Sequence, residues 1–162
     1  MRPRTPGSRR RAFTLIEAVI VVLALGISIP TTLVWLSDAN DRRADSVTQT
    51  RATALATLVM EHVLADVSSK VSGLGFTALD NAAVYVDDPS EGLRVRLSPM
   101  TSLYTGMGIS YSVDIGGLVD KAGAASGDAT QDLFRLVTVT VSFTDSEGAA
   151  RNLELQSMVA AL

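Results

Sequence analysis

An apolar run near the start of the chain limits what this sequence can fold into. From Phe13 to Leu36 the only charged residue is Glu17, and as an α-helix these residues span roughly 36 Å at about 1.5 Å per residue. The hydrocarbon core of a bilayer is about 30 Å thick, so the run is long enough to cross it. We therefore predict a transmembrane helix at residues 13–36. An acid inside such a segment is costly, which makes Glu17 a candidate functional residue.

Basic residues precede the apolar run. Arginine occupies positions 2, 4, 9, 10 and 11, with no acid among residues 1–12, whereas both signs of charge follow Leu36. This asymmetry predicts a cytoplasmic N-terminus and a C-terminal part outside the cytoplasm, with Trp35 as an anchor at the outer interface. A cleavable secretory signal has a shorter apolar region and a small-residue cleavage site. A plain signal anchor fits the same pattern, so it stays open as an alternative.

A short motif joins the basic leader to the apolar run. Residues 13–17 read Phe-Thr-Leu-Ile-Glu, which resembles the processing and methylation motif of type IV prepilins and type II secretion pseudopilins. The resemblance implies that a prepilin peptidase cuts between Ala12 and Phe13 and methylates the amine of Phe13. Glu17 matches the acid that in this family pairs with the amine of a neighbouring subunit during assembly. The family usually has Gly before the cut, where this chain has Ala12.

The resemblance implies a structural role and no enzymatic one. We expect a minor pilin or pseudopilin in an inner (cytoplasmic) membrane, assembled into an envelope filament through its N-terminal helix. The implied partners are prepilin peptidase, other pilin or pseudopilin subunits, an inner-membrane assembly platform and membrane lipid. The chain has no cysteine and so lacks the C-terminal disulfide loop of many major pilins, which favours a pseudopilin. The alternative is a single-span, membrane-anchored extracytoplasmic binding domain that does not polymerise.

Residues 37–71 read as an amphipathic continuation of the helix. There is no Gly or Pro from Ala44 to Val71. Apolar residues recur every four positions at Leu55, Val59, Val63 and Val67, and Leu58 and Leu64 lie beside them. This spacing predicts one apolar stripe over residues 44–70 that packs on a small sheet. Gly73 and Gly75 are expected to mark the end of the helix.

Residues 72–162 are predicted to form an extracytoplasmic antiparallel β head. Expected strands are 83–86, 93–97, 109–115, 134–144 and 151–159, and residues 116–132 are expected to form a long loop. The clearest strand is 134–144, where Val137, Val139, Val141 and Phe143 alternate with mostly hydroxyl residues; with 151–159 it predicts a C-terminal hairpin. The expected fold class is therefore α+β and pilin-like, with a long N-terminal helix packed on a small antiparallel sheet.

The sequence offers little for catalysis or cofactor binding. His62 is the only histidine, and its place in the amphipathic helix favours a packing role over a catalytic one. Acids cluster at Asp87, Asp88 and Glu91 and at Asp128 and Asp132, but neither group matches a calcium loop, so no cofactor is expected. Without residues 1–12 the formal charge is −8, from 9 basic and 17 acidic residues. This excess of acid argues against nucleic acid as a partner.

Overall fold

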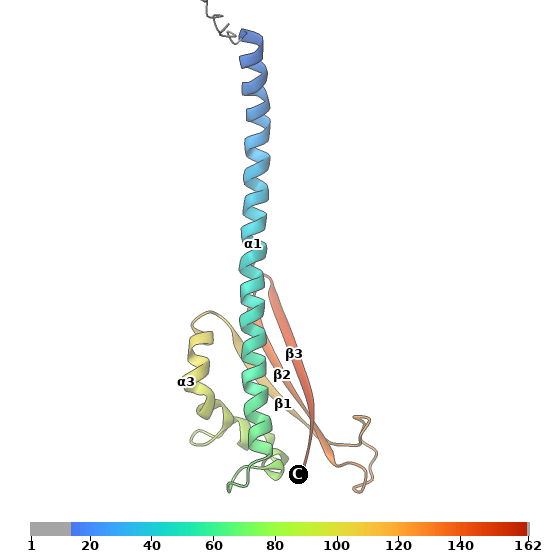
Figure 1. The fold of residues 1–162 in the computed structure, drawn as a ribbon. Coiled ribbons are helices and arrows are strands. Elements are labelled where there is room, and N and C mark those ends of the chain that lie inside the picture. The colour runs from blue at the N-terminus through green and yellow to red at the C-terminus, as the bar shows by residue number, and fades with distance from the viewer. Residues whose placement is uncertain (1–13, 162) are drawn as a thin grey trace, which may run out of the picture. The chain divides into compact units, whose positions relative to one another are not determined.

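The computed structural model describes residues 14–161, and Ala12 and Phe13 lie outside this range. Its first element is the 53-residue helix α1 (Leu15–Val67). The described residues divide into two compact units, with the boundary between Arg42 and Arg43. The first unit contributes the apolar part of α1, which is long and apolar enough to cross a membrane once. Figure 1 shows α1 in blue to green.

The second unit begins with the remaining part of α1, which packs on a sheet. Leu55, Val59 and Val63 are completely buried and Val67 nearly so, which confirms the predicted stripe. Leu58 is half-buried beside it, whereas Leu64 is exposed and does not belong to the stripe. Burial of one such side chain is worth about 1.5–3 kcal/mol, so this face alone accounts for much of the attachment of α1 to the head.

The end of α1 differs slightly from the prediction. The helix ends at Val67, a few residues before the predicted end at residue 70. Gly73 and Gly75 both have positive φ, 85° and 95°, and the amide of Gly75 donates to the carbonyl of Asp66 at 2.9 Å. The glycines therefore close the turn after the helix, and the intervening residues already belong to that turn.

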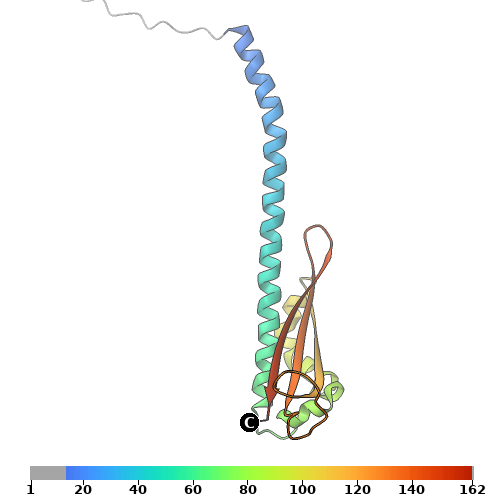
Figure 2. The same cartoon turned by 90° about the vertical axis from the view of Figure 1, so that its right-hand side faces the viewer.

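Three antiparallel strands form one sheet in the order β1-β2-β3 (Figures 1 and 2). They are β1 (Ser110–Val119), β2 (Phe134–Thr144) and β3 (Ala150–Ala160). Val137, Val139 and Val141 of the central strand are completely buried against α1, which confirms the predicted alternation and the C-terminal hairpin. The predicted loop at residues 116–132 is wrong in its first part, because β1 continues to Val119 through a bulge at Gly116 and Gly117.

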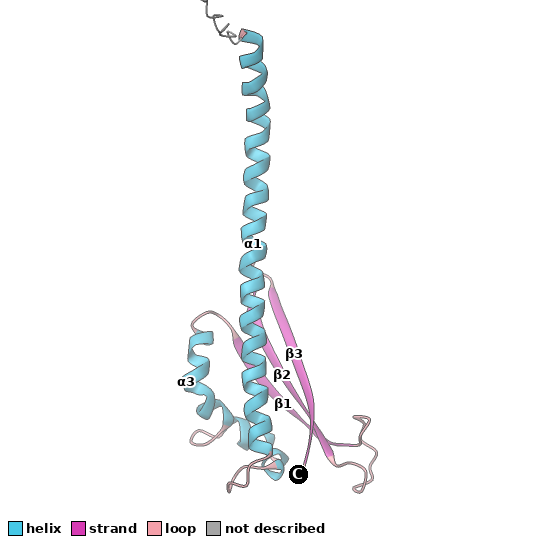
Figure 3. Cartoon of the chain, viewed as in Figure 1, coloured by secondary structure: helices cyan, strands magenta, loops and turns pink. Residues whose placement is uncertain are grey.

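Two predicted strands are helices (Figure 3). Residues 83–86 lie in α2 (Ala82–Asp87) and residues 93–97 in α3 (Leu93–Thr105), after the short 3₁₀ helix η1 (Phe76–Asp80). The side chain of Asn81 accepts a hydrogen bond from the amide of Val84 and so caps α2. In α3 the buried residues are Leu93, Leu97 and Thr101, a four-residue spacing. The head therefore begins with helices, and its sheet starts only at Ser110.

Candidate assembly site on the N-terminal helix

Glu17 lies in the first turn of α1 and forms a reciprocal cap with Thr14. The amide of Glu17 donates to Thr14 Oγ1 at 3.4 Å, and the amide and hydroxyl of Thr14 both reach Glu17 Oε2 at 3.5 Å. These contacts are long, but their arrangement is that of a capping box, Thr-x-x-Glu. The carboxylate therefore lies at the N-terminal end of the helix, where the helix dipole favours negative charge. The predicted cut between Ala12 and Phe13 falls outside the described residues and stays a prediction.

Large exposed apolar side chains cover most of the surface of the first part of α1. From Leu15 to Leu36 their exposed fractions run from 43 % to 85 %. They are Leu15, Ile16, Val19, Ile20, Val21, Val22, Leu23, Leu25, Ile27, Ile29, Leu33, Val34, Trp35 and Leu36. Covering a fully exposed side chain of this kind is worth about 1.5–3 kcal/mol, so covering the exposed part of all of them is worth at least about 10 kcal/mol. This surface requires lipid or other protein around it.

The polar groups within the apolar part of α1 bond to their own helix. The hydroxyl of Ser28 donates to the carbonyl of Ala24 at 2.7 Å, and that of Thr32 donates to the carbonyl of Ser28 at 2.8 Å. Pro30 lies inside the helix and has no amide to offer the carbonyl of Gly26. In an apolar surrounding, hydroxyl groups need hydrogen-bond partners within the protein, and these have them. The carbonyl of Gly26 lacks the helical hydrogen bond that residue 30 would otherwise donate, so the helix is locally weaker there.

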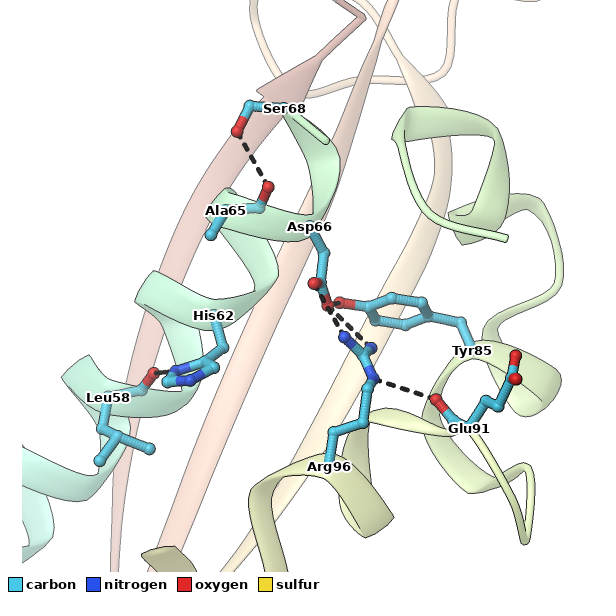
Figure 4. A network of polar contacts seen from close by, with 8 residues as sticks. All are labelled: Leu58, His62, Ala65, Asp66, Ser68, Tyr85, Glu91 and Arg96. Atoms are coloured by element: carbon cyan, nitrogen blue, oxygen red, sulfur yellow. Dashed lines mark hydrogen bonds and ion pairs between the residues drawn. The ribbon is translucent and has the colours of Figure 1, made fainter. Parts of the chain in front are cut away.

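A polar network that the sequence analysis missed ties the end of α1 to the helices of the head (Figure 4). Both carboxylate oxygens of Asp66 bind the guanidinium of Arg96, each at 2.8 Å, and Oδ2 also accepts from the Tyr85 hydroxyl at 2.7 Å. Arg96 Nε donates to the carbonyl of Glu91 at 3.0 Å. Asp66 is nearly buried. The network therefore joins α1, α2 and α3 through one desolvated carboxylate.

The network shifts the titration of its members. Burial, followed by the hydrogen bond to Asp66 and its negative charge, raises the pKa of Tyr85 well above its ordinary value. The hydrogen bond to Asp66 raises the pKa of Arg96. Both shifts favour the state with a neutral tyrosine and a charged arginine, which is the state that the observed hydrogen bonds need. We assign a structural role to this cluster.

The acids considered for calcium serve turns of the head. Asp132 accepts from the amide and hydroxyl of Ser126, and Asp128 from the amide and hydroxyl of Thr130. Asp88 accepts from the amides of Ser90 and Glu91, and Asp87 pairs with Arg94. Residues 14–161 contain no group of three or more His, Asp or Glu side chains that could hold a metal ion.

His62 lies half-buried on α1. Its Nδ1 is 2.9 Å from the carbonyl of Leu58 one turn earlier (Figure 4). This contact within the helix gives the side chain a packing position.

No protein-family model, curated protein or solved structure significantly matches the chain. The geometry itself shows a long N-terminal apolar helix that continues into a helix packed on a small antiparallel sheet. This arrangement is consistent with a pilin-like architecture.

Proposed function

We propose that the chain is a minor pilin or pseudopilin, a structural subunit of an envelope filament of the type II secretion or type IV pilus class. In this proposal prepilin peptidase removes residues 1–12 in the inner membrane, with the N-terminus cytoplasmic and the head outside. The mature chain then joins other subunits at a membrane assembly platform. Residues 13–36 serve first as the membrane span and afterwards as the packing segment of the filament.

One observation carries this proposal. The same helix has an apolar surface exposed on all sides from Leu15 to Leu36 and a single apolar stripe buried by its own head from Leu55 to Val67. A plain membrane anchor needs only the first of these properties. The continuation of α1 into the core of the head supports a filament subunit, in which the helix that packs between subunits also carries the head.

The position of Glu17 supports a role in assembly. Its carboxylate lies at the start of α1 beside Thr14, the residue that follows the predicted cut site and Phe13 in the sequence. In an apolar surrounding a carboxylate is stabilised by an opposite charge within a few ångströms. The amine of a neighbouring subunit would supply that charge and set the axial register of the two helices.

Processing is tested by intact mass and N-terminal sequencing of the protein isolated from its native membrane. The proposal expects a chain that begins at N-methylated Phe13. An unprocessed chain, or one cut beyond Trp35, would contradict it and favour a signal anchor or a secreted domain.

Assembly is tested by comparing Glu17→Ala with Asp41→Ala, which removes an exposed acid farther along the same helix. We expect both variants to insert into the membrane. Only Glu17→Ala should lose co-purification with pilin or pseudopilin subunits. Equal co-purification of both variants would contradict the assigned role of Glu17.

A further inference from the structure

The head has two open sheet edges that run in the same direction. Because the sheet is an antiparallel meander, its outer strands β1 and β3 are parallel to each other. Within residues 14–161, the ladder hydrogen bonds of Ser110–Ile115 and of Ala150–Ala160 go to β2. The outer row of backbone groups on each edge is therefore free to pair with another strand.

The two edges differ in how they are shaped. Beside the first residues of β1 lies a groove of about 830 Å³, bounded on its other side by Val95, Pro99 and neighbouring residues of α3. The regular part of β1 ends at Ile115, where the glycine bulge interrupts its register. By contrast, β3 pairs with β2 without interruption over its whole length. The β1 edge therefore borders a groove that could accept an added strand, and the β3 edge is a long regular strand that could be added.

We propose that the groove between α3 and β1 receives strand β3 of a second copy of this chain, which extends the sheet from one head to the next. The proposal rests on the proposed function only in placing both copies in one membrane. Antiparallel pairing of two β1 edges or two β3 edges would invert one head, so that residues 43–67 of the two α1 helices would run in opposite directions. Parallel pairing of β1 with β3 keeps the two heads in the same orientation.

Charge favours this pairing over the other parallel ones. Parallel pairing of β3 with β3 in register would place Arg151 beside Arg151 and Glu154 beside Glu154, and pairing of β1 with β1 would place Asp114 beside Asp114. Like charges side by side destabilise a sheet. Through β2, Ser112 aligns with Glu154 and Asp114 aligns with Gln156. A second head placed beside the first with no shift along the strands would therefore bring these neutral–acid pairs side by side.

Apolar surfaces on the two partners are also complementary. Val95 and Pro99 of α3 line the groove, and Val95 is 43 % exposed. On β3, Leu153 and Leu155 face the core but are only partly buried. Buried residues of α1, α3 and β2 form one core, so an added β3 would bring its core-facing leucines toward the groove that Val95 and Pro99 line. Both surfaces would lose contact with water.

Cysteine cross-linking tests the contact, because the native chain has no cysteine. Full-length Ser112→Cys and Glu154→Cys chains with different tags are co-expressed, and their membranes are oxidised. Each chain then carries a single cysteine, so every disulfide that forms joins two chains. We expect a doubly tagged dimer to dominate over both singly tagged dimers. Replacing Ser112→Cys by Asp114→Cys shifts the register by two residues and should reduce the yield.

A second variant tests the apolar part of the contact. Val95→Glu on α3 should reduce the doubly tagged dimer by about tenfold, whereas Val84→Glu, at an exposed valine of α2 that does not line the groove, should leave it unchanged. Both changes are on the surface, so the fold is preserved. A doubly tagged dimer no more abundant than the singly tagged ones overturns the strand-edge contact. That result leaves the proposed function intact if Glu17→Ala still blocks assembly. If instead the doubly tagged dimer forms but the chains are not processed after Ala12, the strand-edge contact stands and the pilin assignment is rejected.

Discussion

Replacement of Asp66 by alanine should destabilise the head by about 3 kcal/mol. The carboxylate is nearly buried and accepts three hydrogen bonds, two from Arg96 and one from the Tyr85 hydroxyl. Breaking a buried ion pair costs about 3–5 kcal/mol. Because the side chain of Arg96 is 31 % exposed, water can solvate part of the released charge, which places the ion-pair loss below that range. Loss of the tyrosine hydrogen bond adds about 1 kcal/mol.

The measurement uses a property of the aromatic residues. All three tyrosines, Tyr85, Tyr104 and Tyr111, lie in the head, whereas the single tryptophan, Trp35, lies in the apolar segment. Near-ultraviolet circular dichroism of tyrosine in the detergent-solubilised full chain therefore follows the head alone. A loss of about 3 kcal/mol should lower its unfolding midpoint by roughly 10 °C.

The matched control for this experiment is Asp87→Ala. Asp87 also pairs with an arginine of α3, Arg94, at 2.8 Å, but both side chains are more than half exposed. An exposed pair of this kind contributes about 0–1 kcal/mol. If Asp66→Ala lowers the midpoint no more than Asp87→Ala does, the buried network does not hold the helices together and the reasoning is refuted.

Three further outcomes are expected. Hydrogen bonds from the amide of Ala149 and from Arg151 hold the pKa of Asp145 below its ordinary value, so its contribution to stability is present above about pH 4 and is lost as the pH falls further. Acid unfolding of Asp145→Asn should show a weaker pH dependence than that of the parent. Because the pKa of Tyr85 is raised, its contribution is present below about pH 10 and lost at higher pH; in an absorbance titration, Tyr85→Phe should remove the tyrosine that ionises last. Finally, a Cβ at Gly92 would lie 2.6 Å from the backbone of Asp88, whereas one at Gly117 would meet nothing within 4 Å. Gly92→Ala should therefore destabilise the head by about 1–3 kcal/mol in chemical denaturation, and Gly117→Ala by clearly less.

The elements that could be predicted from the sequence are those with an unambiguous period. The stripe from Leu55 to Val63 has no competing pattern, and neither has the alternation of Val137, Val139 and Val141. Residues 93–97 are ambiguous, because apolar residues at 93, 95 and 97 read as alternation. In the structure Val95 is exposed and Thr101 completes a helical spacing with Leu93 and Leu97. Thr101 occupies the third buried position of α3; a leucine there would have made the helical spacing visible in the sequence.

The buried network was beyond sequence reasoning for a different reason. Asp66 and Arg96 are 30 positions apart, and no local rule relates them. One signal was present: Asp66 lies between Val63 and Val67 on the buried side of α1. An acid on a core-facing stripe needs a partner. The sequence could therefore have shown that a partner exists, but the turn through Gly73 and Gly75 decides which one.

The apolar side chains in the two parts of α1 are buried by different partners, so mutations in the two parts should have different effects. The stripe at Leu55, Val59 and Val63 is covered by the chain's own sheet, so its energetics belong to the stability of the head. The surface from Leu15 to Leu36 is exposed within residues 14–161, so it acquires its stabilisation from outside the chain. Changes at Asp66 should therefore alter head stability without altering membrane insertion, and changes at Glu17 should alter assembly without altering the tyrosine signal of the head. A Glu17 variant that unfolded the head would show that the two parts of the helix are coupled and that loss of assembly cannot be read as a loss of subunit contact.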